Sequence, residues 1–266
     1  MKKTINTKEK EKINYTRDYR HLEKIGILYM LQMMILLVPL IVVYLCLYTK
    51  MTQAVADFSA YIISEVTGKT TSLVKLDYLP VFGGVYCVKM SGKSPSFTFA
   101  IISCMVSLIL ILCFSVAKNK NKPLMIFFTI ASWVHFVSSL YFVFFTRMFP
   151  YNLNDYSELY IKQQVIIWMI IMTVYVLTTS MIPDMFVYRV GLFMALMILE
   201  FLYGVVRYVI YMVIIAEGTY IFMAVLFFVF GIMFDFLILV AVYSVYIYVA
   251  GFRYKNKKRG DMWQWS

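Results

Sequence analysis

The sequence of 266 residues has few of the residues that build metal centres, disulfide frameworks and catalytic dyads. Its two histidines, His21 and His135, are too far apart to form a local metal motif. Its four cysteines show no paired spacing, and Cys46, Cys104 and Cys113 lie in apolar runs. No glycine-rich phosphate-binding loop is present, so coupling to ATP within this chain is not expected. The sequence therefore predicts no metal site and no cofactor.

Charged residues are also scarce. They make up 15% of the chain against 62% hydrophobic residues, and the mean hydropathy is +0.77. This composition is typical of membrane proteins. The net charge of +11 is carried in short blocks between apolar runs, a pattern that indicates membrane topology rather than nucleic-acid binding. The predicted partner is therefore the lipid bilayer, and no nucleic acid is expected.

Six apolar runs are long enough to cross a bilayer core of about 30 Å at about 1.5 Å per residue. The spans are predicted at residues 25–48, 97–117, 124–146, 163–182, 190–215 and 220–250. The first is predicted to be an uncleaved signal anchor, and the alternative is cleavage near Ala54–Ala56. We therefore predict an all-α polytopic membrane protein with one six-helix membrane domain over residues 26–252.

Two polar segments between the spans, residues 49–96 and 147–162, are predicted to lie outside. In the first, the spacing of apolar residues over 55–66 predicts a short amphipathic helix. Farther on, apolar residues alternate over 72–79, and a strand-like run follows at 85–90 after a proline–glycine turn. This pattern predicts a β-hairpin, with a hydrophobic loop as the alternative.

Lysine and arginine are concentrated in the N-terminus (1–25), in the turn 118–122 and in the tail (253–266). Short cytoplasmic segments of membrane proteins carry an excess of these two residues. We therefore predict that both termini are cytoplasmic and that the protein is a multi-pass protein of the plasma membrane of a bacterial cell.

The fifth predicted span carries two charged residues, Glu200 and Arg207. Each costs about 2.5–3.5 kcal/mol at the centre of a bilayer. A spacing of seven residues is two helical turns, so both side chains share a face, with Gly204 between them. Such a face points at protein or at a water-filled cavity. Counting along the span places Arg207 near the outer boundary of the membrane and Glu200 near its midplane.

An outward-facing polar pocket is predicted around Arg207. Its predicted members are Asp155, Glu158, Gln163, Gln164, Tyr208 and Glu217, with Tyr156 and Ser157 as candidate catalytic residues beside Arg207. Two interpretations of the guanidinium stay open. It binds a carboxylate or phosphate of a substrate, or it extends to the interface and pairs with Glu158 or Glu217.

A second group of ionisable residues lies within the predicted spans: His135, Glu200 and Asp235. They form a proton path if they share one cavity, because histidine titrates near neutrality and a desolvated carboxyl group is easily protonated. The alternative is that each makes an interhelical hydrogen bond that fixes packing. Residue counting places Asp235 in the cytoplasmic half of the membrane.

The run Gly204–Tyr208, placed after a loop motif at 155–158 and before a last span, resembles the exosortase and archaeosortase family. Members of this family are small polytopic membrane proteins with an outward-facing site of Cys, Arg and His or Arg. The resemblance covers about residues 150–250, and Arg207 is the site residue that carries over. Glycine stands at position 204 where the family has Asn, no cysteine lies near position 157, and no histidine follows Arg207.

The resemblance implies an activity on a secreted protein or a cell-envelope polysaccharide at the outer face of the membrane. Arg207 would bind a carboxylate or a developing oxyanion, and Ser157, Tyr156 or Cys87 would be the nucleophile. The alternative function is a non-enzymatic accessory or permease-like subunit of a membrane transport or envelope-assembly system. In that case His135, Glu200 and Asp235 would serve packing or proton handling.

Overall fold

The computed structural model describes residues 27–79, 83–116, 122–180 and 186–256. The elements in chain order are α1 (Ile27–Thr67), β1 (Ser72–Leu79), β2 (Gly83–Lys89), α2 (Phe97–Val116), α3 (Pro123–Phe145), η2 (Thr146–Met148), α4 (Leu153–Ser180), α5 (Phe186–Glu217), η3 (Tyr220–Phe222), α6 (Met223–Phe227), η4 (Phe228–Met233) and α7 (Phe234–Asn256). The basic N-terminus and most of the other two basic segments lie outside the described residues.

Six helical segments of the described chain are long and apolar enough to cross a membrane, in agreement with the number of spans that the sequence predicts. They are Leu37–Thr67, Phe97–Val116, Pro123–Met148, Leu153–Thr178, Val190–Glu217 and Tyr220–Val249. These six helices are those of a multi-pass membrane protein.

The first helix differs from the sequence prediction. We predict a span that ends at Tyr48 and a separate amphipathic helix, whereas α1 is one continuous helix of 41 residues. The reason is that the intervening residues 49–54 contain neither proline nor glycine, so nothing ends the helix there. The helical face predicted over 55–66 is wrong in its register, because Phe58 and Val66 are exposed and the buried face of this half includes Val55 and Ile63.

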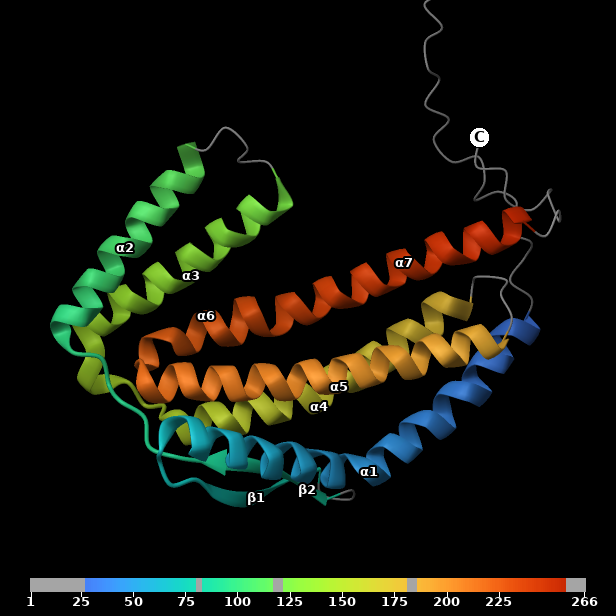
Figure 1. Ribbon diagram of the computed structural model, residues 1–266, viewed down its shortest axis with the longest axis horizontal. Coiled ribbons are helices and arrows are strands. Elements are labelled where there is room, and N and C mark those ends of the chain that lie inside the picture. The colour runs from blue at the N-terminus through green and yellow to red at the C-terminus, as the bar shows by residue number, and fades with distance from the viewer. Residues whose placement is uncertain (1–26, 80–82, 117–121, 181–185, 257–266) are drawn as a thin grey trace, which may run out of the picture.

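The β-hairpin expected over residues 72–90 is present. Strand β1 pairs antiparallel with β2, with Ser72 opposite Lys89 and Leu76 opposite Val85. Its inner strand packs on the helices through buried Val85, Cys87 and Val88. The hairpin lies against α1 and the beginning of α4 (Figure 1).

The segment that we predict as a polar loop, 147–162, is mostly helical, because α4 begins at Leu153. Asn152 caps this helix, since its Oδ1 accepts the N–H groups of Asn154 and Asp155 at 2.8 and 3.1 Å. In return, the N–H of Asn152 donates to Oδ2 of Asp155 at 2.8 Å. This reciprocal pair is a capping box. The helix therefore starts earlier than the hydropathy pattern indicates, and Asp155 is used by the cap.

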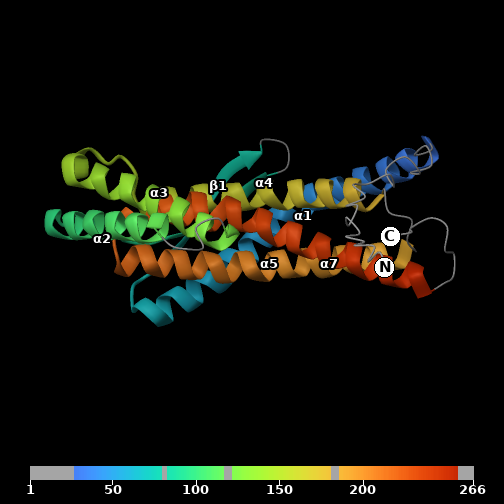
Figure 2. The same cartoon turned by 90° about the horizontal axis from the view of Figure 1, so that it is seen from above.

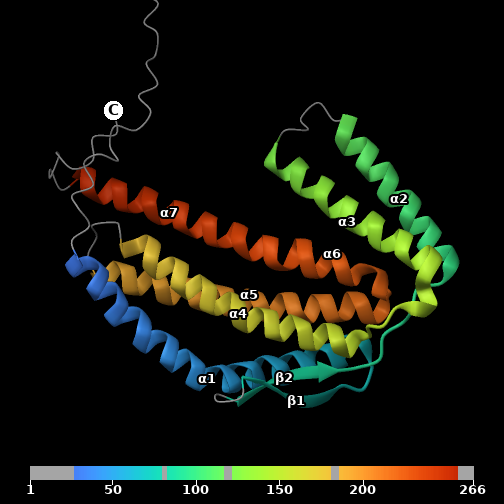
Figure 3. The ribbon, with the colours of Figure 1, turned by 180° about the vertical axis from the view of Figure 1, so that it is seen from behind.

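Helices α4 and α5 and the last span, which runs from η3 through α7, lie side by side along the long axis of the molecule (Figures 1 and 3). Helix α1 covers α4 and α5 on the side opposite the last span. The beginning of α1, the beginning of α5 and the end of α7 lie at the same end of the molecule (Figure 1). The helices α2 and α3 pack against each other and diverge from α7, touching the bundle near α6 (Figures 1 and 2).

Candidate functional site

The candidate site is a buried polar centre in which α4, α5 and the last span meet around Arg207. The guanidinium binds both carboxylate oxygens of Asp235, with Nη1 2.5 Å from Oδ1 and Nη2 2.9 Å from Oδ2. Nη2 also donates to Gln164 Oε1 at 2.6 Å, and Nε donates to the Tyr160 hydroxyl at 2.8 Å. Arg207 is only 2% exposed, so these protein groups replace water as its partners.

The backbone of the last span contributes to the same centre. Its segment η4 is a π-helix, in which hydrogen bonds run from residue i to i+5 and carbonyl groups are less regularly engaged than in an α-helix. Nη1 of Arg207 donates to the carbonyl of Gly231 at 3.2 Å, and the Tyr211 hydroxyl donates to the carbonyl of Phe230 at 2.7 Å. The local widening of the helix thus supplies acceptors to α5.

Aromatic rings surround the guanidinium. Its central carbon lies 5.4 Å from the centre of the Tyr160 ring and 5.1 Å from that of Tyr203. Cation–π contacts of this kind are worth about 2 kcal/mol or more when desolvated. The Tyr160 ring in turn stacks on Tyr208 at 5.1 Å, and its hydroxyl donates to the carbonyl of Gly204 at 3.0 Å.

The two antiparallel helices α4 and α5 are held in a fixed register. Tyr160 lies opposite Tyr208, and Gln164 lies opposite Gly204, where an added Cβ would be 3.2 Å from Gln164 Nε2. One turn farther along, the same register brings Trp168 to the level of Glu200. Glycine at position 204 therefore lets the long amide side chain of α4 reach the centre.

Glu200 is the unpaired charged residue of this centre. Its side chain is fully buried, and among the described residues neither carboxylate oxygen has a hydrogen-bond partner. It is electrostatically coupled to Asp235 and to Arg207. The centre thus contains one basic group and two acidic groups, and only one acid is paired.

The predicted separation of Arg207 and Asp235 is wrong. We predict the two residues in opposite halves of the membrane, whereas their side chains form an ion pair and therefore meet at one level of the bundle. Arg207 lies ten residues, or about 15 Å, before the end of α5, and Asp235 lies 15 residues, or about 22 Å, after the start of the last span. The length of the arginine side chain spans the difference.

The acidic residues that we expect beside Arg207 have other partners. Glu158 pairs with Lys162 at 2.5 Å, and Glu217 pairs with Lys69 at 2.8 Å and with Lys93 at 3.8 Å. The predicted pairing of Arg207 with Glu158 or Glu217 is therefore wrong. Each of the two carboxylates forms an ion pair with a nearby lysine instead of with Arg207.

The predicted glutamines have different surroundings. Gln164 binds Arg207, whereas the amide of Gln163 lies beside Gly231 and has no hydrogen-bond partner among the described residues. Tyr160, Tyr203 and Tyr211 are site residues that the sequence reasoning missed. For Tyr160 a signal was available, because Tyr156, Tyr160, Gln164 and Trp168 recur at every fourth position and so share one face of the helix.

The three candidate nucleophiles lie in the neighbourhood of Arg207 but are buried. Ser157 Oγ is 2.6 Å from the Tyr208 hydroxyl, which also accepts the N–H of Val88 at 3.0 Å. Cys87 Sγ donates to the carbonyl of Val74 at 3.7 Å. Burial raises the pKa of the Cys87 thiol, and the nearby Glu158 carboxylate adds to this rise.

No histidine or carboxylate hydrogen-bonds to Cys87, Tyr156 or Ser157 among the described residues. A nucleophile of this kind is activated by such a base or by a lowered pKa. The contacts of the three side chains therefore provide no activation in this conformation.

The structure divides the predicted group of intramembrane ionisable residues. Glu200 and Asp235 belong to the polar centre, whereas His135 lies in the α2–α3 seam. There its Nε2 is 2.8 Å from Ser103 Oγ, and its ring stacks on Phe222 at 5.2 Å.

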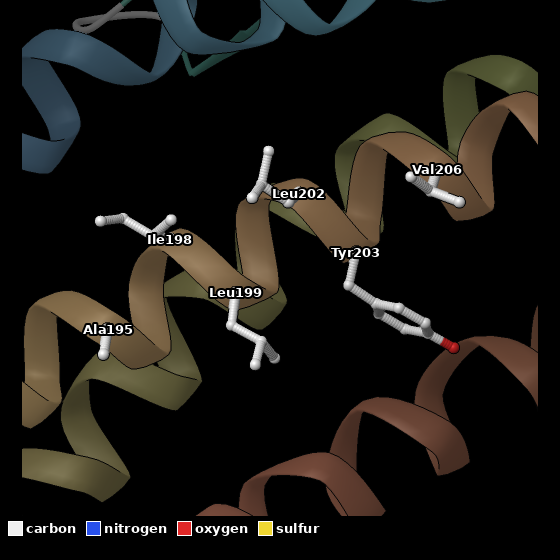
Figure 4. A pocket seen from close by; sticks show the side chains of 6 residues that line it. All are labelled: Ala195, Ile198, Leu199, Leu202, Tyr203 and Val206. Atoms are coloured by element: carbon white, nitrogen blue, oxygen red, sulfur yellow. The ribbon is translucent and has the colours of Figure 1, made fainter.

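A shallow apolar groove lies on the outer face of α5, beside the centre. It is lined by Ala195, Ile198, Leu199, Leu202, Tyr203 and Val206 (Figure 4). Tyr203 is its polar member and points toward the neighbouring helix, where its ring stacks on Phe234 at 5.8 Å. The Tyr203 ring therefore separates the groove from the Arg207 guanidinium.

Comparison of the chain with protein-family models, with curated proteins and with solved structures finds no match.

Proposed function

We propose that the chain is a permease-like subunit of a membrane transport system, located in the plasma membrane with both termini in the cytoplasm. In this proposal the polar centre of α4, α5 and α7 handles a proton, and Glu200 carries it. The single observation behind the proposal is a fully buried carboxyl group without a hydrogen-bond partner, next to a closed Arg207–Asp235 ion pair.

The charge balance of the centre supports a proton on Glu200. Arg207 and Asp235 offset each other through two charge-assisted hydrogen bonds. An ionised Glu200 would leave one net negative charge in a low-dielectric interior, where an uncompensated charge is costly. Uptake of one proton removes that charge, and loss of the proton restores it. Intramembrane carboxyl groups in proton pumps and transporters work in this way.

The test is proton flux through the purified chain in liposomes. A potassium gradient with valinomycin sets a membrane potential, and an enclosed pH-sensitive dye reports proton entry. We expect the wild type to conduct protons above the level of empty liposomes and Glu200→Gln to abolish the flux, because the amide keeps the shape but cannot titrate.

Glu158→Gln is the matched control, since Glu158 is a carboxylate of α4 that is paired with Lys162 at 2.5 Å outside the centre. It should conduct like the wild type. Equal flux in Glu200→Gln and wild type would overturn the proposal, and so would a wild-type flux no higher than that of empty liposomes.

The second candidate is an exosortase-like activity on a secreted protein or envelope polysaccharide at the outer membrane face. It is favoured by the contact of Ser157 with the Tyr208 hydroxyl, because the Tyr208 ring stacks on Tyr160, whose hydroxyl binds Arg207. A covalent adduct on Cys87, Ser157 or Tyr156, found by mass spectrometry of protein purified from cells, would support it. Absence of any adduct in both the wild type and Arg207→Lys would count against it.

A further inference from the structure

We propose that the seam between α4 and α5 binds a file of internal water molecules that connects Glu200 with the α4 start. This inference rests on the proposed proton function and names the route by which the proton reaches Glu200. On α4 the seam is the face formed by Tyr156, Tyr160, Gln164 and Trp168. These residues are spaced by four positions and so cover about 18 Å along the helix.

The first observation is a concentration of unsatisfied polar atoms along this face. Among the described residues, the Tyr156 hydroxyl, Gln164 Nε2 and Trp168 Nε1 have no hydrogen-bond partner. All three side chains are more than nine-tenths buried. Folded proteins satisfy nearly all buried polar groups, with protein atoms or with ordered water. A row of three such groups on one helix face therefore indicates a ligand shared along the row.

The chemistry of these atoms identifies the ligand. The Trp168 indole N–H and Gln164 Nε2 are donors, which do not bind a cation, while the two free oxygens of Glu200 are acceptors, which do not bind an anion. Water donates and accepts, and it occupies buried sites that offer two to four polar partners. Water is therefore the ligand that fits both kinds of group.

The register of the helices connects the row to Glu200. Because Tyr160 faces Tyr208 and Gln164 faces Gly204, Trp168 lies at the level of Glu200. Glycine at position 204 has no side chain, and the Gln164 amide of α4 packs against it.

Arg207 borders the seam without blocking a proton. An unpaired arginine in a pore repels protons. Here, however, the guanidinium is offset by Asp235 of α7, and its donors are directed to Asp235, Gln164, Tyr160 and backbone carbonyls. The charged and titratable groups coupled to Glu200 are thus Arg207 and Tyr203 of α5 and Asp235 of α7.

The proton transfer balances along such a file. Glu200 gives its proton to the adjacent water, each water passes one proton on as it receives one, and one proton leaves at the level of Tyr156. Glu200 is restored when it takes up a proton from the side opposite the α4 start, so one proton crosses the bundle in each cycle. No other reactant is consumed.

The experiment is X-ray radiolytic footprinting of the full chain, read by mass spectrometry, because hydroxyl radicals form at bound water and label the side chains beside it. We expect Tyr156 and Trp168 to be oxidised several-fold faster than Phe142, an equally buried ring in the α2–α3 region. Equal rates for the three residues would overturn the hydrated seam.

A second arm measures proton flux in Tyr156→Phe and Trp168→Phe, with Tyr48→Phe as the control because the Tyr48 hydroxyl is bonded to the carbonyl of Gly83 outside the seam. We expect a several-fold lower flux in the two seam variants and no change in the control. A flux lost in Glu200→Gln but normal in both seam variants would overturn this route and leave the proposed function standing. If Tyr156 and Trp168 are labelled rapidly but the proton flux does not depend on Glu200, the seam contains water and the proposed proton function is overturned.

Discussion

Two regions of the molecule bury polar side chains between apolar helices in different ways. In the α2–α3 seam the groups are neutral. Ser107 Oγ donates to the carbonyl of Ser103 at 2.7 Å and Ser139 Oγ to that of His135 at 2.8 Å, each within its own helix, and Ser103 Oγ meets His135 Nε2 across the seam at 2.8 Å. In the α4–α5–α7 centre the groups are charged, and every hydrogen-bond partner of the Arg207 side chain comes from another helix.

The difference teaches which polar groups determine the packing of the bundle. A serine that binds the carbonyl four residues earlier is satisfied in an isolated helix and needs no neighbour. A buried guanidinium has five donors and a full charge, so it requires partners from several helices. In Figure 1, α4, α5 and α7 run side by side, whereas α2 and α3 pack against each other and diverge from α7.

The largest expected effect is on the charged region. Asp235→Asn removes the charge that offsets Arg207 and should lower the free energy of unfolding by about 3–5 kcal/mol, because a buried charge is left uncompensated. Thermal unfolding in detergent, followed by circular dichroism, measures the loss. The control is Glu158→Gln, which breaks a half-exposed pair and should cost less than about 1 kcal/mol. Equal losses of unfolding free energy in both variants would show that the buried Arg207–Asp235 pair contributes no more than the half-exposed pair.

The close approach of α4 and α5 gives the next largest effect. Gly204→Leu places a side chain where Cβ alone is 3.2 Å from Gln164 Nε2, so overpacking should cost about 1–3 kcal/mol. The matched control on the same helix is Gly191→Leu, because nothing lies within 4 Å of its added Cβ. Its higher helix propensity should stabilise the protein by up to about 1 kcal/mol. Variants of equal stability would contradict the close packing at Gly204.

Tyr208→Phe tests the link between the hairpin and the bundle. It removes the hydroxyl that accepts the N–H of buried Val88 at 3.0 Å and contacts Ser157 at 2.6 Å. The unsatisfied groups should cost about 1–3 kcal/mol. Tyr151→Phe, at an exposed tyrosine, is the control and should leave the unfolding temperature unchanged. An unchanged unfolding temperature in Tyr208→Phe would mean that the hairpin is held by its apolar contacts alone.

The smallest effect is expected in the α2–α3 seam. Ser103→Ala removes the hydroxyl that meets His135 Nε2 at 2.8 Å and should cost about 0.6 kcal/mol, the average for a hydrogen bond between membrane helices. The same unfolding measurement checks it. A loss as large as that of Asp235→Asn would remove the distinction between the two regions.

The six spans and the hairpin could be predicted from the sequence because they depend on composition and on alternation over short windows. The start of α4 was not predicted from hydropathy, because its capping residue, Asn152, lies in a polar segment whose composition is typical of a loop. Helix α1 is continuous because no proline or glycine lies between residues 48 and 55. The sequence prediction divides it there because the hydropathy falls at this point.

The candidate site was predicted in part. Glu200, Gly204 and Arg207 share a face because seven residues are two helical turns, and this inference needs no tertiary information. The partner of Arg207 was not predictable in the same way, since Asp235 is brought to it by the lateral packing of α5 on the last span and follows directly after the π-helical segment η4 of that span. Counting residues along a span gives an expected depth for Glu200 and for Asp235, but it does not show which side chain of another helix lies beside them.

The central claim is that Arg207 and Asp235 form one closed unit inside the bundle. A double-mutant cycle with Arg207→Met and Asp235→Leu, measured by thermal unfolding in detergent, tests it most directly. We expect each single variant to lose about 3–5 kcal/mol and the double variant to be close to the wild type, because removing both charges leaves neither unpaired. A double variant that loses the sum of the two single effects would contradict the claim.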